Sequence, residues 1–260
     1  MQKLGRAATV TYALLLYAFI FFPVIVLVLF SFQGSLFPVP PFNGPSLRWY
    51  RAALGDERLT SALVNSLLVA VSSSIVSVLL GFLAAYGFAR YRLRGTAFFR
   101  GLITAPLSVS YLIIGMGLLI LFNGTGVPKS LTAAAIGHVV INLPLCFAII
   151  YSQFGEHQVN IERAARDLGA NDWQVLILIT APILWPALFA SFFLSMTFSW
   201  DEFVIAFLLT RFDTTLPVEI WSLLRSGLSP KTNAIGSVVF GISVIMVLVL
   251  ELVVLRRRKS

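Results

Sequence analysis

The sequence predicts an all-α, polytopic membrane protein with six transmembrane helices. Of its 260 residues, 58% are hydrophobic and only 12% are charged, whereas an ordinary soluble domain carries about 25% charged residues. The mean hydropathy is +0.90, and six separate stretches reach the roughly 20 mainly apolar residues that a spanning helix needs. These observations exclude a typical soluble enzyme and a nucleic-acid-binding domain, although the formal net charge is +8.

The predicted spans cover residues 9–32, 62–89, 102–122, 131–153, 183–209 and 233–255. The first follows Lys3 and Arg6, as a signal peptide would, but its apolar core is too long for one and no clear cleavage site follows. We therefore expect a retained helix rather than a cleaved signal. Pro106 and Pro144 are expected to kink or end the helices that contain them.

The positive charges predict that both termini are cytoplasmic. Six spans place both ends on one side, and most of the 19 basic residues fall on that side. Cytoplasmic loops are enriched in Lys and Arg, so the outer connections are 33–61, 123–130 and 210–232. The basic residues assigned to the cytoplasm are Lys3, Arg6, Arg90, Arg92, Arg94, Arg100, Arg163, Arg166, Arg256, Arg257, Arg258 and Lys259.

The chain is expected to have three parts and no separate soluble domain. Residues 1–61 form the N-terminal transmembrane helix and an ordered extracytoplasmic loop, rich in turn formers, with a short helix near Trp49 and Tyr50. Residues 62–255 form a core of five transmembrane helices with a cytoplasmic loop at 154–182. Residues 256–260 form a basic cytoplasmic tail.

The sequence lacks the motifs of catalysis, nucleotide binding and metal coordination. Residues 124–130 resemble a phosphate-binding loop only loosely, because the spacing is wrong and the Gly-Lys pair is missing. Neither His138 nor His157 has a metal-ligating neighbour four residues on, so we expect no catalytic and no metal site. For His138, a hydrogen bond to a neighbouring helix is favoured over a place along a transport path. Cys146 is the single cysteine and forms no internal disulfide.

The cytoplasmic connection 154–182 carries the most informative pattern. It predicts two short helices separated at Gly169, because glycine accepts the left-handed conformation that commonly ends a helix. Asn160 is expected to cap the first helix and Asn171 the second, with Gln174 completing a capping box. Such a pair of helices suits docking into a groove of a soluble partner, and equally an interfacial position on lipid head groups. The apolar face of the first helix comprises Ile161, Ala164, Ala165 and Leu168.

This connection resembles the cytoplasmic signature of permeases of bacterial ATP-binding-cassette importers, E-A-A-x(3)-G-x(9)-I-x-L-P. The chain departs from it by an extra residue, Arg163, between the glutamate and the alanine pair, and by Ala181 in place of leucine. The resemblance covers about residues 60–255. The matching residues are Glu162, Ala164, Ala165, Gly169, Ile179 and Pro182.

The resemblance implies the MetI-like fold of type I importers, in the bacterial inner (plasma) membrane and surrounded by lipid. It implies partners: two ATP-binding-cassette ATPase subunits, an extracytoplasmic solute-binding protein and a second permease, for which a homologous chain is favoured over a copy of this one. ATP and Mg would be bound by the ATPase, so this chain would bind no cofactor and catalyse no reaction. A coupling helix at 161–168 would enter a cleft of the ATPase, with contacts from Glu162, Ala164, Ala165, Leu168 and Gly169.

Two acidic residues, Asp201 and Glu202, lie within the fifth predicted span. A charge near the bilayer centre costs roughly 2.5–3.5 kcal/mol on insertion scales, and consecutive helical residues point about 100° apart. At least one of the two should therefore face a cavity, where it would favour a cationic substrate, or another helix, where it would be structural. Trp200, Trp221 and Tyr111 are candidates to stack on such a cation, although aromatic anchoring at the membrane interface is the commoner role.

The surroundings of these acids resemble the spermidine/putrescine branch of importer permeases. This implies transport of a polyamine, such as spermidine or putrescine, by alternating access. The alternative cargoes are another amine-bearing solute, a phosphonate or a ferric ion, and the alternative class is a membrane-embedded enzyme. The matching residues lie at 199–203, 215–218, 220–222, 229–230 and 233–234.

Overall fold

The computed structural model describes residues 2–91, 94–227 and 229–258, and every regular element in this part of the chain is a helix. The all-α prediction is thereby confirmed. Arg92 and the last two residues of the predicted basic tail lie outside the described residues. The elements are α1 (Gln2–Ser31), α2 (Arg48–Leu54), α3 (Glu57–Arg90), α4 (Thr96–Thr104), η1 (Ala105–Ser108), α5 (Tyr111–Thr125), α6 (Leu131–Tyr151), α7 (Glu156–Asp167), α8 (Asp172–Gln174), η2 (Val175–Thr180), α9 (Ala181–Ile183), α10 (Trp185–Trp200), α11 (Val204–Leu209), α12 (Leu216–Ser226) and α13 (Pro230–Arg258).

Four helical segments of the described chain are long and apolar enough to cross a membrane alone: Thr9–Ser31, Glu57–Arg90, Leu131–Tyr151 and Pro230–Leu252. Two bent pairs are further candidates. Thr96–Ser108 and Tyr111–Thr125 meet at 109°, and Asp172–Ile183 and Trp185–Trp200 meet at 72°. The number of spans reaches the predicted six when each bent pair counts as one.

Two predicted spans are not continuous helices. The span 102–122 is broken between α4 and α5, where Pro106 lies in the 3₁₀ turn η1, since proline interrupts the hydrogen bonds of an α-helix. The span 183–209 is interrupted after Trp200, and α11 starts only at Val204. Pro144 lies inside α6, which continues through it, so of the two expected outcomes, a kink or a helix end, the helix end does not occur at this proline.

The chain forms two compact units, residues 1–61 with 219–242 and residues 62–218 with 243–260. In the first unit, the buried side chain of Gln33 orders the loop that follows α1. Its amide nitrogen donates to the carbonyls of Val39 and Pro41, both at 3.0 Å, and its amide oxygen accepts from the Asn43 N–H at 2.6 Å. The ordered loop and the short helix predicted near Trp49, now α2, are confirmed.

In the second unit, small residues let three helices pack closely. Four buried residues recur every four positions along α10, and this spacing places them on one face. On α3, a Cβ added at Gly81 would lie 3.0 Å from the Cys146 Cβ of α6, so that glycine permits the close approach typical of membrane helices. The α10 residues are Ala187, Ser191, Ser195 and Ser199.

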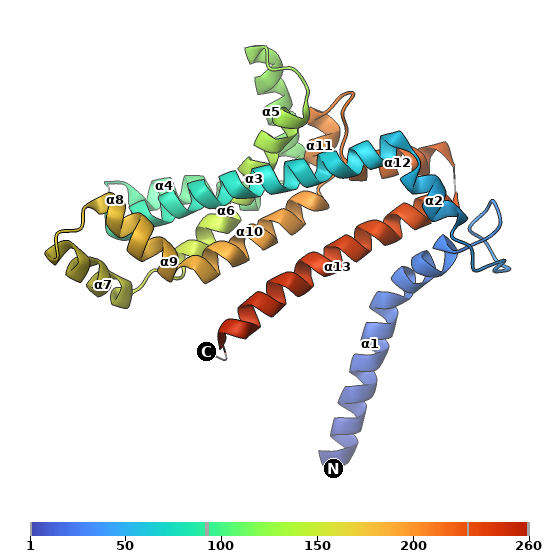
Figure 1. The fold of residues 1–260 in the computed structure, drawn as a ribbon, viewed down its shortest axis with the longest axis horizontal. Helices are drawn as coiled ribbons and strands as arrows, with labels where there is room; N and C mark the ends of the chain where they lie inside the picture. The colour runs from blue at the N-terminus through green and yellow to red at the C-terminus, as the bar shows by residue number, and fades with distance from the viewer. Residues whose placement is uncertain (1, 92–93, 228, 259–260) are drawn as a thin grey trace. The chain divides into compact units, whose positions relative to one another are not determined.

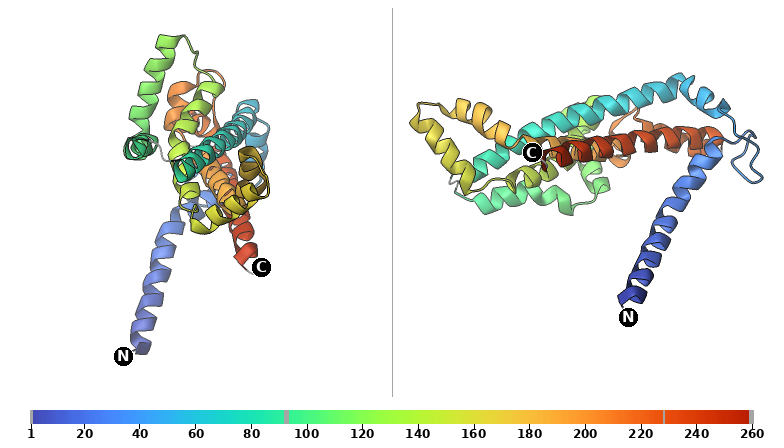
Figure 2. Two further views of the ribbon diagram at one scale, coloured as in Figure 1. Left: turned by 90° about the vertical axis from the view of Figure 1, so that its left-hand side faces the viewer. Right: turned by 60° about the horizontal axis from the view of Figure 1, so that its bottom comes forward.

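The ribbon views show where the two predicted helices of 154–182 lie within this unit. Figures 1 and 2 both place α7 and α8 together at the end where α3 finishes. The far end of α10, by contrast, leads into α11, which packs against α5 and α6. The second unit therefore carries its polar connection at one end and the break after Trp200 toward the other.

Candidate functional site

The first helix of the polar connection, α7, begins at Glu156 rather than at residue 161. Gly155 is its N-cap residue, and the Gly155 N–H donates to Gln158 Oε1 at 3.0 Å. Asn160 therefore lies inside the helix and does not cap it, so that prediction was wrong. The reason is that the helix begins five residues earlier, where the side-chain amide oxygen of Gln158 accepts from the N–H of the N-cap residue Gly155.

The end of α7 and the start of α8 follow the prediction. Gly169 has φ +91°, the left-handed conformation expected of a residue that ends a helix. The side chain of Asn171 accepts from the Gln174 N–H at 2.9 Å, and Gln174 Oε1 accepts from the Asn171 N–H at 2.9 Å. Both halves of the predicted capping box are confirmed.

Glu162 faces the interior of its own unit, with only 1% of its side chain exposed. Its two carboxylate oxygens accept from Arg90 Nε at 2.6 Å and Nη2 at 2.9 Å, and Thr180 Oγ1 donates to Oε1 at 2.9 Å. The Arg90 guanidinium also lies 4.9 Å from the ring centroid of Phe154. A buried carboxylate is tolerated when it is both paired and hydrogen-bonded, and Glu162 is both.

The other residues predicted to contact an ATPase lie at or near the surface. Ala164 and Gly169 are exposed, Ala165 is half-buried and Leu168 is 90% exposed. Trp173, which sequence reasoning did not single out, is 70% exposed. Its position two residues after the predicted cap at Asn171 was the available signal. The connection between α7 and η2 therefore exposes two large apolar side chains, Leu168 and Trp173.

The break between α10 and α11 lines a cavity of about 480 Å³, which brings together Tyr111, Asp201 and Glu202. Trp200 does not line it and is 1% exposed. Trp221, the remaining predicted pathway residue, lies on α12 within the other compact unit. The lining residues are Tyr111, Leu194, Thr197, Phe198, Asp201, Glu202, Phe203 and Val204.

The two acidic residues have different surroundings. Asp201 is exposed, and its carboxylate has no hydrogen bond or ion pair within the described chain. Glu202 is 5% exposed and accepts from the Ile205 N–H at 2.9 and 3.0 Å and from the Ala206 N–H at 3.1 Å. These N–H groups lie in the first turn of α11, where a helix has no carbonyl of its own to offer them. Glu202 therefore supports the start of α11, and Asp201 is left to the cavity.

A series of buried polar side chains leads from Glu202 to residues of three helices. His138 Nε2 on α6 lies 3.3 Å from Glu202 Oε2, and His138 Nδ1 lies 2.6 Å from Ser199 Oγ on α10. Ser199 Oγ is in turn 3.1 Å from Ser73 Oγ on α3. The predicted hydrogen bond from His138 to a neighbouring helix is confirmed. Within the described residues, no group of His, Cys, Asp and Glu side chains forms a metal site.

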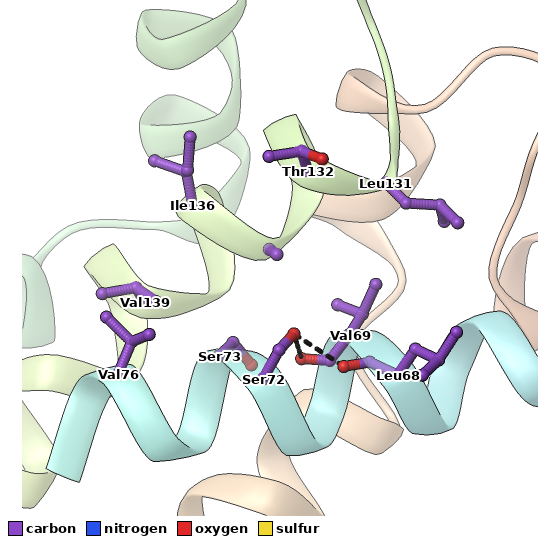
Figure 3. A pocket seen from close by; sticks show the side chains of 10 residues that line it. Leu68, Val69, Ser72, Ser73, Val76, Leu131, Thr132, Ile136 and Val139 are labelled. Carbon is purple, nitrogen blue, oxygen red and sulfur yellow. Dashed lines mark hydrogen bonds between the residues drawn. The ribbon is translucent and has the colours of Figure 1, made fainter. Parts of the chain in front are cut away.

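A second cavity, of about 500 Å³, lies between α3 and α6 and is lined mainly by apolar side chains (Figure 3). The hydroxyl of Ser72 donates within its own helix, to the carbonyls of Leu68 at 2.6 Å and Val69 at 3.3 Å. No charged side chain lines this cavity. It therefore provides fewer favourable contacts for a bound cation than the cavity beside Asp201 does.

Comparison with known proteins agrees with this architecture. The chain is 30% identical to the spermidine/putrescine transport system permease protein PotC of Escherichia coli (strain K12), over 99% of this chain and 97% of the relative. It is 35% identical to the putrescine transport system permease protein PotI of the same organism, over 88% of this chain and 84% of the relative.

Solved structures show the same fold. A chain of a bacterial ABC transporter involved in the import of the acidic polysaccharide alginate matches with a TM-score of 0.70 and 20% identity, covering 96% of both chains. A chain of the MetNI methionine ABC transporter, in an inward-facing conformation, matches with a TM-score of 0.56 and 13% identity, covering 76% of this chain and 97% of that one. The predicted fold is confirmed. The family model described as the binding-protein-dependent transport system inner membrane component matches residues 77–259, and the chain belongs to this family of transport proteins.

Proposed function

We propose that the chain is the permease subunit of an ATP-driven importer that moves a polyamine, such as spermidine or putrescine, across the inner membrane by alternating access. The observation that supports a polyamine as the solute is the Asp201 carboxylate, which has no partner in the described chain and lines a cavity with aromatic walls. The substrates in the names of the relatives agree with this chemistry.

The cavity has the chemistry that a small organic cation requires. Its volume of about 480 Å³ falls within the usual range for small-molecule sites, about 300–1,000 Å³. A carboxylate forms strong hydrogen bonds with an ammonium group, and the rings of Tyr111, Phe198 and Phe203 can stabilise a cation or pack on an alkyl chain. No cationic side chain lines the cavity, which disfavours a phosphonate.

The assembly that we propose contains two ATP-binding-cassette ATPases, a second permease and an extracytoplasmic solute-binding protein. The ATPases dock on the exposed surface around Leu168 and Trp173 and bind the ATP and Mg, because this chain contains no phosphate-binding loop. Both termini are cytoplasmic, as the distribution of basic residues favours. The binding protein delivers the solute to the outer connections 33–61 and 210–232.

Reconstituted transport tests this function. Proteoliposomes holding the chain with its ATPase, second permease and binding protein are expected to accumulate labelled putrescine when ATP is supplied. Asp201→Asn should lower uptake strongly without loss of assembly, whereas Asp213→Asn, at an exposed position outside the cavity, should not. Unchanged uptake in Asp201→Asn would refute the proposed cargo site. Turnover of a lipid by the chain alone would favour the enzyme alternative.

A further inference from the structure

The charges of α7 are divided between an inner and an outer side. Glu162 is held inside by Arg90 and Thr180, whereas the next residue, Arg163, is exposed. Within the described chain Arg163 forms no hydrogen bond or ion pair. Consecutive helical residues point about 100° apart, so one position separates a fully paired buried anion from an unpaired surface cation.

The neighbouring arginine of α7 is already engaged. Arg166 Nε donates to Asp172 Oδ1 at 3.0 Å, and Arg166 Nη2 donates to the hydroxyl of Tyr86 on α3 at 3.3 Å. Desolvation opposes the charged form of Arg166, but the hydrogen bond to Asp172 and the surrounding Tyr86, Asp172 and Glu162 together raise its guanidinium pKa, which agrees with its two hydrogen bonds. Among the arginines of α7, Arg163 is the one available to another molecule.

The position of Arg163 in the sequence indicates that its guanidinium would lie in the interface with the ATPase. It directly precedes the pair Ala164-Ala165, the position that a glutamate holds in the signature E-A-A-x(3)-G. The exposed alanine of that pair is the next residue of the helix, and the exposed Leu168 lies at the end of the helix. A partner that covers the alanine would therefore also contact the guanidinium of its neighbour, and a cation covered by a partner needs an anion opposite.

We infer that Glu162 is an internal positioning residue, and that the charge which this segment offers to the ATPase is the cation of Arg163, opposite a carboxylate of the ATPase. This rests on the proposed docking of an ATPase at α7. The bidentate pair with Arg90 fastens α7 to the end of α3, and the bond from Thr180 fastens it to η2, which leads into α10. Movement of α7 with a docked ATPase would then move both helices.

Binding of the purified ATPase to the detergent-solubilised permease complex, measured at several salt concentrations, tests the role of Arg163. Arg163→Glu should weaken binding on the order of tenfold and reduce its dependence on salt, because a like-charge contact replaces an opposite one. Arg163→Lys should stay near wild type. Arg100→Gln, which changes another exposed cytoplasmic arginine, is the matched control and should bind normally.

The amount of solute imported per ATP hydrolysed distinguishes the role of Glu162 from that of Arg163. In proteoliposomes, Glu162→Gln should bind the ATPase normally but import on the order of fivefold less solute per ATP hydrolysed, because the neutral amide holds Arg90 more weakly. Arg90→Lys should show the same defect, and the double variant should be no worse, as expected of two residues acting as a pair.

Three results would overturn this assignment in whole or in part. Wild-type binding by Arg163→Glu would remove Arg163 from the interface. Weakened, less salt-dependent binding in Glu162→Gln, equal to that of Arg163→Glu, would show that Glu162 contacts the ATPase directly. Normal solute import per ATP in both Glu162→Gln and Arg90→Lys would end the positioning role. Failure of the wild-type complex to bind any ATPase would instead refute the proposed function itself.

Discussion

Replacing Glu202 with alanine is expected to destabilise the start of α11 rather than to remove a solute contact. The substitution leaves the Ile205 and Ala206 N–H groups without their acceptor, and both residues are 0% exposed. A buried donor left unsatisfied costs about 1–3 kcal/mol, so the two together should cost about 2–6 kcal/mol. Glu202→Gln keeps one acceptor oxygen and should lose less, since bonds to a charged acceptor are roughly twice as strong as neutral ones.

Thermal denaturation of the detergent-solubilised complex and hydrogen exchange along α11 measure this effect. Glu202→Ala should lower the melting temperature clearly and increase amide exchange at Ile205 and Ala206, with Glu202→Gln between it and wild type. Asp201→Asn is the matched control. Its carboxylate has no partner in the described chain, so melting and exchange should stay at the wild-type level while uptake falls.

The reasoning is refuted if Glu202→Ala melts like wild type, keeps its α11 amides protected and loses transport as Asp201→Asn does. Both acids would then act on the solute. A stable Glu202→Ala that transports normally would refute the structural role as well.

Three further predictions concern other parts of the chain. Gly137→Val should cost about 1–3 kcal/mol by overpacking, because a Cβ there would collide with a side chain of α11, whereas Gly117→Val on α5, with open space around its Cβ, should melt like wild type. Tyr111→Ala should raise the KM for polyamine uptake about 2- to 30-fold, as loss of a cation–π contact of about 0.5–2 kcal/mol predicts, and a KM at the wild-type value would exclude this ring from the site. The hydrogen bond from Lys231 at 2.5 Å holds the pKa of Asp56 below its ordinary value, so the carboxylate stabilises the folded state above its ordinary pKa and this contribution is lost as the pH falls through the lowered value. Protection factors of the amides at the start of α13, which correct for the intrinsic pH dependence of exchange, should therefore fall in acid, and Asp56→Asn should show the lower protection already at neutral pH.

The features that local sequence determines could be predicted. The left-handed Gly169 and the reciprocal cap of Asn171 and Gln174 each depend on residues within one helical turn, and both appear in the structure. The apolar runs likewise located the four spans that are single helices, because a bilayer selects for length and hydropathy alone.

The features that distant residues determine could not be predicted. The inward orientation of Glu162 depends on Arg90, 72 positions earlier in the chain, and no periodicity within α7 indicates it. The helix break at 201–203 contains neither glycine nor proline. It exists because the carboxylate of Glu202 replaces the missing acceptors of α11, beside His138 of α6. A carboxylate within an apolar run could not by itself predict a helix break, because the N–H groups that it accepts from are known only from the structure.

The contrast between the two neighbouring carboxylates bears on how such a permease changes its cargo over evolutionary time. The carboxylate at 202 accepts the first N–H groups of α11, whereas the carboxylate at 201 has no partner in the described chain. Position 201 is therefore open to mutation without a penalty in helix formation, while position 202 is not. A descendant with a neutral or basic residue at 201 would keep the same scaffold and present a differently charged cavity. At the solute site that we propose, a change of one codon would then be enough to favour another class of solute, without a rebuilt membrane helix.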